Sequence, residues 1–231
     1  DPAYEYRMYL PLAGLIALAA AGVWTALARL PVPAGLRWGL GVALAAAAIL
    51  GYGAATVHRN AVYRSELALW ADVLRHRPEN PVAHINLGKS LALDGQPDAA
   101  VRHYAEAVRL EPGYAEAYNN WALLLQARGD GPGAERLLRQ ALAFKPAWAE
   151  LHYNLGNVLV RQERLAEAAA AYARALELEP QLAEAHINWG NVLLLQGDVA
   201  GAEAHYRRAL VLNPLHPDAR RNLARLQGQG R

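Results

Sequence analysis

A 34-residue spacing of proline is the feature that most limits how this chain can fold. Pro78, Pro112, Pro146, Pro180 and Pro214 follow one another at that interval in a sequence of 231 residues. A fixed period of this length is typical of stacked helical units, because one unit cannot bury its apolar face without its neighbours. The sequence after residue 64 therefore predicts an array of repeats.

Other positions keep the period when each repeat is numbered so that its proline is position 32. The repeats then run 81–114, 115–148, 149–182 and 183–216. Position 20 reads Ala100, Ala134, Ala168 and Ala202, and position 24 reads Tyr104, Leu138, Tyr172 and Tyr206. Apolar residues within a unit follow a helical period in two stretches, at 82–93 and 97–110 in the first repeat. With a half-repeat at 64–80 and a terminal helix at 217–227, the predicted solenoid domain spans residues 64–228.

These positions resemble the tetratricopeptide repeat (TPR). The resemblance rests on the fixed period and on small residues at position 8, which are Gly88, Ala122, Gly156 and Gly190. It implies an all-α solenoid, a right-handed superhelix of helix pairs whose first helices line a concave surface. It also implies that the array binds a protein partner.

A row of asparagines is the strongest candidate for a binding role. Position 6 reads Asn86, Asn120, Asn154 and Asn188, and Asn222 follows in the terminal helix. A carboxamide both donates and accepts hydrogen bonds, so such a row can bind an extended peptide through its backbone. With helices about 8–10 Å apart and a strand rising about 3.3 Å per residue, one Asn would meet about every third peptide residue. The row is similar to the asparagine ladder of the O-GlcNAc transferase TPR domain, and Lys89, Asn157 and Asn191 complete the predicted groove.

An alternative reading is that the position-6 asparagines serve only hydrogen bonds within the array. The groove's charges do not favour a site for a free C-terminus, because Glu116, Glu150 and Glu184 oppose Lys89 and Arg161. Val82, Ile85, Tyr153 and Ile187 are instead predicted to make the groove partly apolar.

Residues 8–57 differ from the rest in composition, because Arg29 and Arg37 are their only charged residues. Met8–Ala28 and Trp38–Val57 are uncharged stretches of 21 and 20 residues. At about 1.5 Å per residue, each can cross a hydrocarbon core of about 30 Å. We therefore expect a membrane hairpin domain at 1–63 with spans at about 8–29 and 37–58. A buried helical hairpin of a soluble protein is the alternative.

Small residues form a ridge on each predicted span. The ridges are Ala13, Ala17 and Ala21 on the first span, and Gly39, Ala43, Ala47 and Gly51 on the second. Small side chains at this spacing let helices approach closely in lipid. The ridges either pack on each other or contact other membrane-protein subunits within the lipid bilayer.

Composition and motifs exclude several classes of chemistry. The chain has no cysteine, and its net charge of +2 gives no electrostatic reason to expect nucleic acid as a partner. Its eight histidines recur at repeat positions and are spread along the array, so no metal site is expected. No phosphate-binding, dinucleotide-binding or nucleophile motif is present. We therefore expect no enzyme activity and no cofactor for this chain.

The junction between the two regions carries a wider resemblance. Glu5-Tyr6-Arg7-Met8-Tyr9-Leu10-Pro11 and the residues Arg59-Asn60, Tyr63, Ser65-Glu66 and Leu69-Trp70 are similar to the C-terminal part of bacterial relatives of the transmembrane-and-TPR O-mannosyltransferases. This implies a bacterial inner-membrane protein with a periplasmic array. Because Met8 directly precedes the first predicted span, the sequence also predicts a longer native chain.

Three functions are compatible with this architecture. The leading hypothesis is a membrane-anchored scaffold that docks a partner protein or extended peptide at the membrane surface. The alternative is the C-terminal fragment of a multi-span membrane glycosyltransferase whose repeats present the acceptor protein. A third is an assembly factor that binds the components of an envelope complex transiently.

Overall fold

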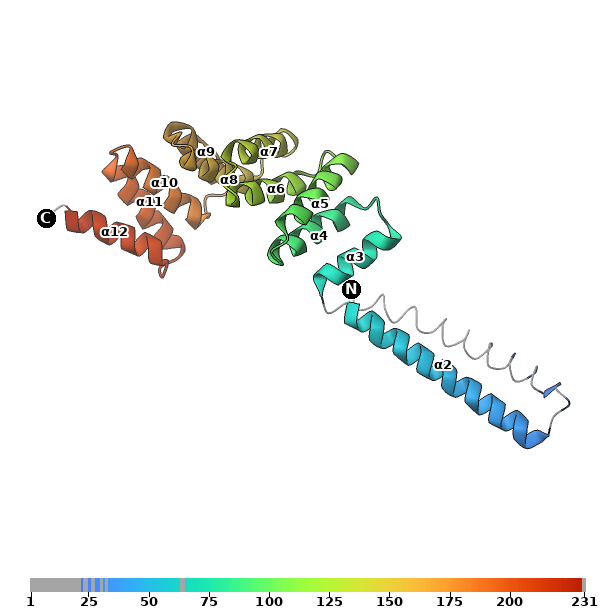
Figure 1. Cartoon of the computed structure of the whole chain (residues 1–231). Coiled ribbons are helices and arrows are strands. Elements are labelled where there is room, and N and C mark those ends of the chain that lie inside the picture. The colour runs from blue at the N-terminus through green and yellow to red at the C-terminus, as the bar shows by residue number, and fades with distance from the viewer. Residues whose placement is uncertain are drawn as a thin grey trace. The chain divides into compact units, whose positions relative to one another are not determined.

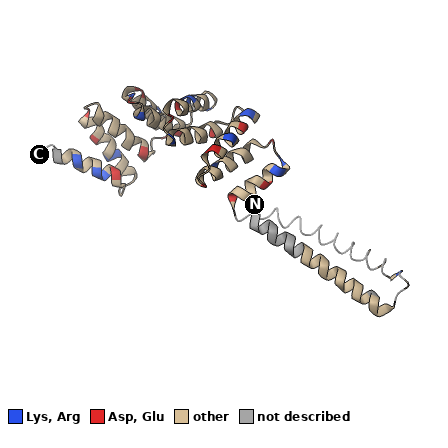
Figure 2. Cartoon of the chain, viewed as in Figure 1, with Lys and Arg blue, Asp and Glu red and all other residues tan. Residues whose placement is uncertain are grey.

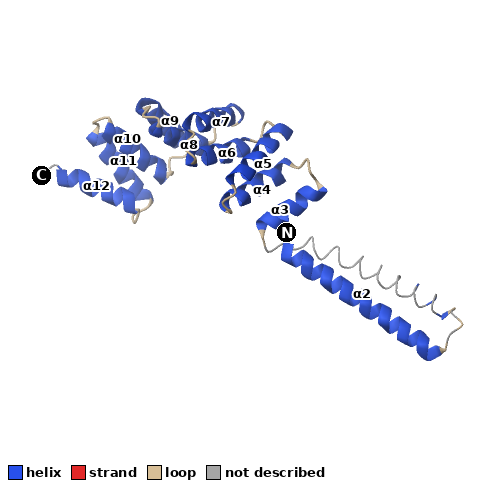
Figure 3. Cartoon of the chain, in the orientation of Figure 1, coloured by secondary structure: helices blue, strands red, loops and turns tan. Residues whose placement is uncertain are grey.

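The computed structural model describes residues 33–62 and 65–229, together with Gly22, Thr25, Ala28, Arg29 and Pro31. The regular secondary structure of these residues is helical (Figure 3). The chain divides into two compact units, Asp1–Ser65 and Glu66–Arg231.

The first unit contains helix α2, Ala34–Val62, which covers the second predicted span. Its stretch Ala34–Gly51 has a mean hydropathy of 1.5 and is not buried, and no other described helix is both long and apolar enough to cross a membrane. That length and composition suit a membrane anchor or a signal sequence. The predicted first span, including Ala13, Ala17 and Ala21, lies outside the described residues, apart from Gly22, Thr25 and Ala28.

The small-residue ridge of α2 is exposed along its length. Gly39, Ala43, Ala47 and Gly51 are all exposed, and a methyl group added at Gly39 or Gly51 would meet no atom within 4 Å. Among the described residues, nothing packs on this ridge. The contact that we expect there with another membrane helix stays a prediction.

The second unit is an array of antiparallel helix pairs. Its helices are α3 (Glu66–His76), α4 (Pro81–Leu93), α5 (Pro97–Leu110), α6 (Ala115–Ala127), α7 (Gly131–Phe144), α8 (Ala149–Arg161), α9 (Leu165–Leu178), α10 (Ala183–Leu195), α11 (Val199–Leu212) and α12 (Pro217–Gln229) (Figure 1). The first helices α4, α6, α8 and α10 contact one another, and each packs on its own second helix. The predicted all-α repeat array is confirmed.

Local residues explain where the helices of a pair end and begin. Gly95, Gly129 and Gly197 have φ angles of 75°, 84° and 86°, so the turn inside each pair needs a left-handed residue that glycine adopts without strain. The third repeat has Glu163 at this position with φ 61°. In the second repeat, the carboxylate of Asp130 then caps α7 by accepting a hydrogen bond from the Gly133 amide at 2.9 Å.

A contact between glycine and tyrosine joins the two helices of a pair. A Cβ atom added at Gly88, Gly156 or Gly190 would lie 2.6, 2.5 or 2.7 Å from Cε1 of Tyr104, Tyr172 or Tyr206, respectively. These three rings are among the most deeply buried large side chains of the array. The second repeat has Ala122 and Leu138 at the same two positions. A residue larger than glycine therefore occurs where the tyrosine ring is replaced by a smaller side chain.

This contact predicts that Gly156→Ala changes the free energy of unfolding in opposite directions, depending on whether residue 172 is tyrosine or leucine. Beside Tyr172, the added methyl group should lower the free energy of unfolding by about 1–2 kcal/mol, the cost of overpacking less the helix-propensity gain of alanine. In a Tyr172→Leu background, which reproduces Ala122 and Leu138, the same substitution should raise it by about 1 kcal/mol. Urea unfolding of the four variants measures both values. Equal effects in the two backgrounds would show that the contact does not limit the helix spacing.

Two pairs of histidines lie between first and second helices. His84 and His103 approach to 2.9 Å between their Nδ1 atoms, and His186 and His205 repeat this arrangement at 2.9 Å. Nε2 of His84 bonds the carbonyl of Pro78 and therefore carries a proton, which leaves its Nδ1 to accept from His103. Burial lowers the pKa of His103, His186 and His205 below its ordinary value.

The lowered pKa values predict a loss of stability in mild acid. As the pH falls, the histidines of the unfolded chain are protonated before those of the folded chain. The contribution of the neutral histidines to the free energy of unfolding is therefore complete above a pH of about 6.5, and it is lost as the pH falls through the folded pKa values. Unfolding midpoints between about pH 7.5 and 5 should therefore decline. Replacing both pairs by the second repeat's Tyr118 and Leu137 (H84Y/H103L/H186Y/H205L) should flatten this decline.

Candidate functional site

A cavity of about 450 Å³ lies along the first helices of the second, third and fourth repeats. It is lined by Leu123, Gln126 and Ala127 of α6, by Asn157, Val160 and Arg161 of α8, by Asn188, Asn191, Val192 and Leu195 of α10, and by Tyr172 of α9. Its volume is within the range of sites for small ligands or short peptide segments. We call this cavity the groove pocket.

Hydrogen bonds between repeats orient the carboxamides of the groove pocket. Asn157 Oδ1 accepts from Tyr172 Oη at 2.8 Å and from Asn188 Nδ2 at 2.9 Å. Asn188 Nδ2 also donates to Tyr153 Oη at 3.2 Å. Burial raises the pKa of Tyr172, which keeps its hydroxyl protonated as a donor. The oxygen of Asn157 is thus held toward the protein.

The next repeat has the same arrangement. Asn191 Oδ1 accepts from Tyr206 Oη at 2.7 Å and from Asn222 Nδ2 at 2.9 Å. In both cases a position-6 asparagine donates to the position-9 asparagine of the preceding repeat. Within residues 65–229, Nδ2 of Asn157 and Asn191 and Oδ1 of Asn188 have no protein partner.

The first two repeats break this pattern because their position-9 residues differ. Leu123 offers no acceptor, so Asn154 donates to Asn119 Oδ1 at 2.9 Å and becomes buried, with 5% of its surface exposed. Lys89 instead pairs with Glu116 at 3.7 Å, and Asn120 Nδ2 is buried without a partner in the described part of the chain.

The predicted groove residues therefore divide into groups. Asn157, Asn188 and Asn191 line the groove pocket, whereas Asn86, Lys89, Asn120, Asn154 and Asn222 do not. The alternative reading was hydrogen bonding inside the array. It applies in part to Asn154, Asn188 and Asn222, because the Nδ2 group of each donates to the Oδ1 atom of another asparagine. Their role in binding a partner stays a prediction.

The predicted apolar lining is wrong at two positions. Ile85 and Ile187 are 2% and 3% exposed, because they belong to the core between helices. The apolar walls are instead Leu123, Val160, Val192 and Leu195. Leu123 and Leu195 stand at positions 9 and 13, on the helix face shared with position 6. This spacing was the signal in the sequence that could have identified them.

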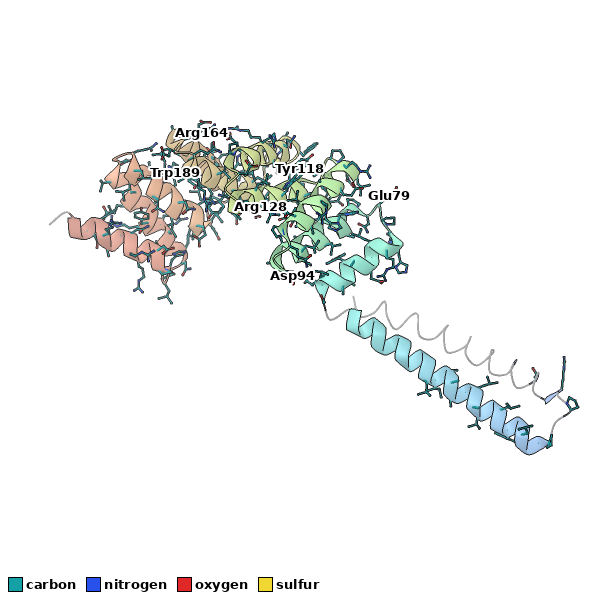
Figure 4. The ribbon with its side chains drawn as sticks, in the orientation of Figure 1. Glu79, Asp94, Tyr118, Arg128, Arg164 and Trp189 are labelled. Atoms are coloured by element: carbon teal, nitrogen blue, oxygen red, sulfur yellow. The ribbon has the colours of Figure 1, made fainter. Side chains whose placement is uncertain are left out.

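Some of the charged side chains along the array form ion pairs in the described structure, and others do not. Basic and acidic residues are both distributed over α3 to α12 (Figure 2). Arg164 bonds Glu135 and Glu167 at 2.6 Å each, between the second and third repeats (Figure 4). Glu184 accepts from His216 at 2.9 Å at the first turn of α10. Arg161, in contrast, reaches only the carbonyl of Gln126, at 3.5 Å.

No metal-binding group is found in the described part of the chain. There, no three histidine or acidic side chains come together as ligands. The polar groups of the groove pocket are carboxamides, a phenol and one guanidinium. Such groups bind a ligand by hydrogen bonds and charge.

Two position-6 asparagines should differ in what they contribute to stability. Asn120→Leu removes a buried donor without a partner and should raise the free energy of unfolding by about 1 kcal/mol. Asn188→Leu removes two hydrogen bonds and should lower it by about 1–2 kcal/mol. Urea unfolding compares the two variants, which carry the same change at equivalent positions. A loss of stability in both would mean that Asn120 has a partner in solution.

Family models match most of the array. The model described as "TPR repeat" matches residues 156–197, and two models described as "Tetratricopeptide repeat" match residues 91–155 and 183–216. No curated protein sequence matches the chain.

Solved structures share this fold. The structure of PilF from Pseudomonas aeruginosa, solved for its functional characterisation, is 27% identical in sequence. Its TM-score is 0.62, and the match covers 67% of this chain and 71% of that one. MamA (41-end) from Desulfovibrio magneticus RS-1 is 23% identical, with a TM-score of 0.61 over 71% of this chain and 97% of that one. A further MamA structure is 24% identical, with a TM-score of 0.59 over 64% of this chain and 86% of that one. The chain is therefore a tetratricopeptide-repeat protein whose array resembles those of PilF and MamA.

Proposed function

We propose that the array is a protein-interaction scaffold that holds an extended segment of a partner protein in the groove pocket. The observation that carries this proposal is that the inter-repeat hydrogen bonds leave some donors and acceptors of the pocket carboxamides without a partner in the described residues. Nδ2 of Asn157 and Asn191 can donate to backbone carbonyls of the segment. Oδ1 of Asn188 can accept from a backbone amide.

The apolar walls of the groove pocket supply the complementary driving force. Leu123 and Leu195 are 38% and 67% exposed, and a bound segment would remove this apolar surface from water. The carboxamides then bind the backbone, and the walls bind alternate side chains of an extended strand. The chain needs no chemistry of its own for this role.

We further propose that α2 anchors this scaffold in a membrane, with the small-residue ridge against other membrane subunits. The apolar stretch Ala34–Gly51 and its exposed ridge support this proposal. The location that we propose is a bacterial inner membrane with a periplasmic array, which rests on the resemblance of the junction sequence. The alternative function is that of a glycosyltransferase fragment, and the three matching family models are all TPR models.

Site-specific photocrosslinking of the full chain in its native cells tests this function. A crosslinking amino acid at Leu195, on the wall of the groove pocket, should yield a discrete adduct with a partner protein. The matched control is Val211 on α11, which is similarly exposed at 70% and does not line the pocket. The adduct should remain in membranes washed with alkaline carbonate and should be lost in the variant N157L/N191L.

Two results would contradict the proposal separately. Adducts of equal yield from Leu195 and Val211 would show that the groove pocket is not the docking surface. Release of the chain into the carbonate wash would show that it is not anchored in the membrane.

A further inference from the structure

The groove pocket has one charged residue among the described residues that line it, Arg161. We propose that this guanidinium binds an acidic side chain of the partner segment, and that the neighbouring side chains of the segment are apolar and pack on Leu123 and Leu195. This inference rests on the proposed function and adds to it the chemical class of the ligand.

Arg161 has donor capacity that the protein does not use. A guanidinium carries five N–H donors in a fixed fork that matches a carboxylate. In the described structure Arg161 makes no ion pair, and its only hydrogen bond, to the carbonyl of Gln126, is 3.5 Å long. The residues that stand at its repeat position in the two flanking first helices, Ala127 and Leu195, are neutral.

Several other arginines of the array differ from Arg161, because they pair with carboxylates. Arg109 pairs with Glu106, Arg128 with Asp98 and Arg174 with Glu177, at 2.6, 2.6 and 2.8 Å. Each of these has a carboxylate within reach on its own helix or the preceding repeat. The other lining residues of the pocket have amide, phenol and apolar side chains.

The carboxamides beside Arg161 also present donors. The oxygens of Asn157 and Asn191 are each occupied by a tyrosine hydroxyl and by an asparagine of the next repeat. Their Nδ2 groups remain, so this side of the pocket requires acceptors from a ligand. A carboxylate supplies acceptors and the opposite charge at once.

The apolar walls strengthen this ion pair, and the groove's acids do not neutralise it. A segment that packs on Leu123 and Leu195 would exclude water around the guanidinium and so lower the local dielectric constant. Glu150 lies at the other end of α8, about 16 Å away along the helix at its rise of 1.5 Å per residue, and this exceeds the screening length of about 8 Å. Glu116 and Glu184 are occupied by Lys89 and His216.

A peptide-display selection on the full chain in detergent micelles tests the inference. The probe is a library of random twelve-residue peptides displayed as loops, so that no terminal carboxylate is free. We expect enriched peptides to carry an Asp or Glu beside apolar residues. These peptides should bind the variant Arg161→Glu about tenfold or more weakly. Selection on that variant should enrich Lys or Arg at the same position instead.

Arg136→Glu is the matched control. Arg136 lies exposed on α7, outside the groove pocket, and makes no ion pair in the described structure. The same change of charge there should leave affinity and peptide preference as in the unchanged chain. Unchanged thermal unfolding of both variants would show that any effect arises from binding.

Three outcomes would overturn the inference, and each has a different meaning. Enriched peptides that lose binding in N157L/N191L but have no acidic position would contradict the role of Arg161 and leave the groove function standing. Binding that depends on Arg161 only in a second library with free C-termini would assign Arg161 to a terminal carboxylate rather than a side chain. No enrichment that depends on the pocket would contradict the proposed function itself.

Discussion

The contact between the position-8 glycine and the position-24 tyrosine is the interaction on which the array depends. In the third repeat Tyr172 packs directly on Gly156, which sets how closely the two helices of the pair approach. The hydroxyl of the same tyrosine bonds Asn157, and Asn157 in turn accepts from Asn188 of the next repeat. Core packing, repeat stacking and the orientation of the groove carboxamides are therefore parts of one connected structure.

Departures from this pattern place the groove pocket. The second repeat replaces the glycine and tyrosine by Ala122 and Leu138, and its position-9 residue is Leu123. The carboxamide chain cannot continue there, so an apolar side chain stands beside the carboxamides of the third and fourth repeats. The pocket combines these carboxamides with apolar side chains, and Arg161 is among the residues that line it. A ligand that is apolar on one part and rich in hydrogen-bond acceptors on another suits this combination.

The array could be predicted from the sequence because its period and turns depend on local residues. The proline spacing and the position-8, -20 and -24 residues were sufficient to predict the helix pairs. The burial of Ile85 and Ile187 could not be predicted in the same way, because period alone does not separate a core face from the adjacent groove face. The isolation of Arg161 depends on which side chains the flanking repeats place beside it, and Asn157 and Asn188 have a defined orientation only after the repeats stack.

Solvent exchange of the side-chain carboxamides, measured by NMR on the ¹⁵N-labelled chain without a partner, tests the central claim most directly. The account predicts that the Asn188 NH₂ group exchanges slowly, because it donates to Asn157 and Tyr153. The NH₂ groups of Asn157 and Asn191 should exchange rapidly, because they face the groove pocket without an acceptor. Rapid exchange of Asn188, or protection of Asn157 and Asn191, would mean that the carboxamides are oriented the other way and that the pocket offers acceptors instead of donors.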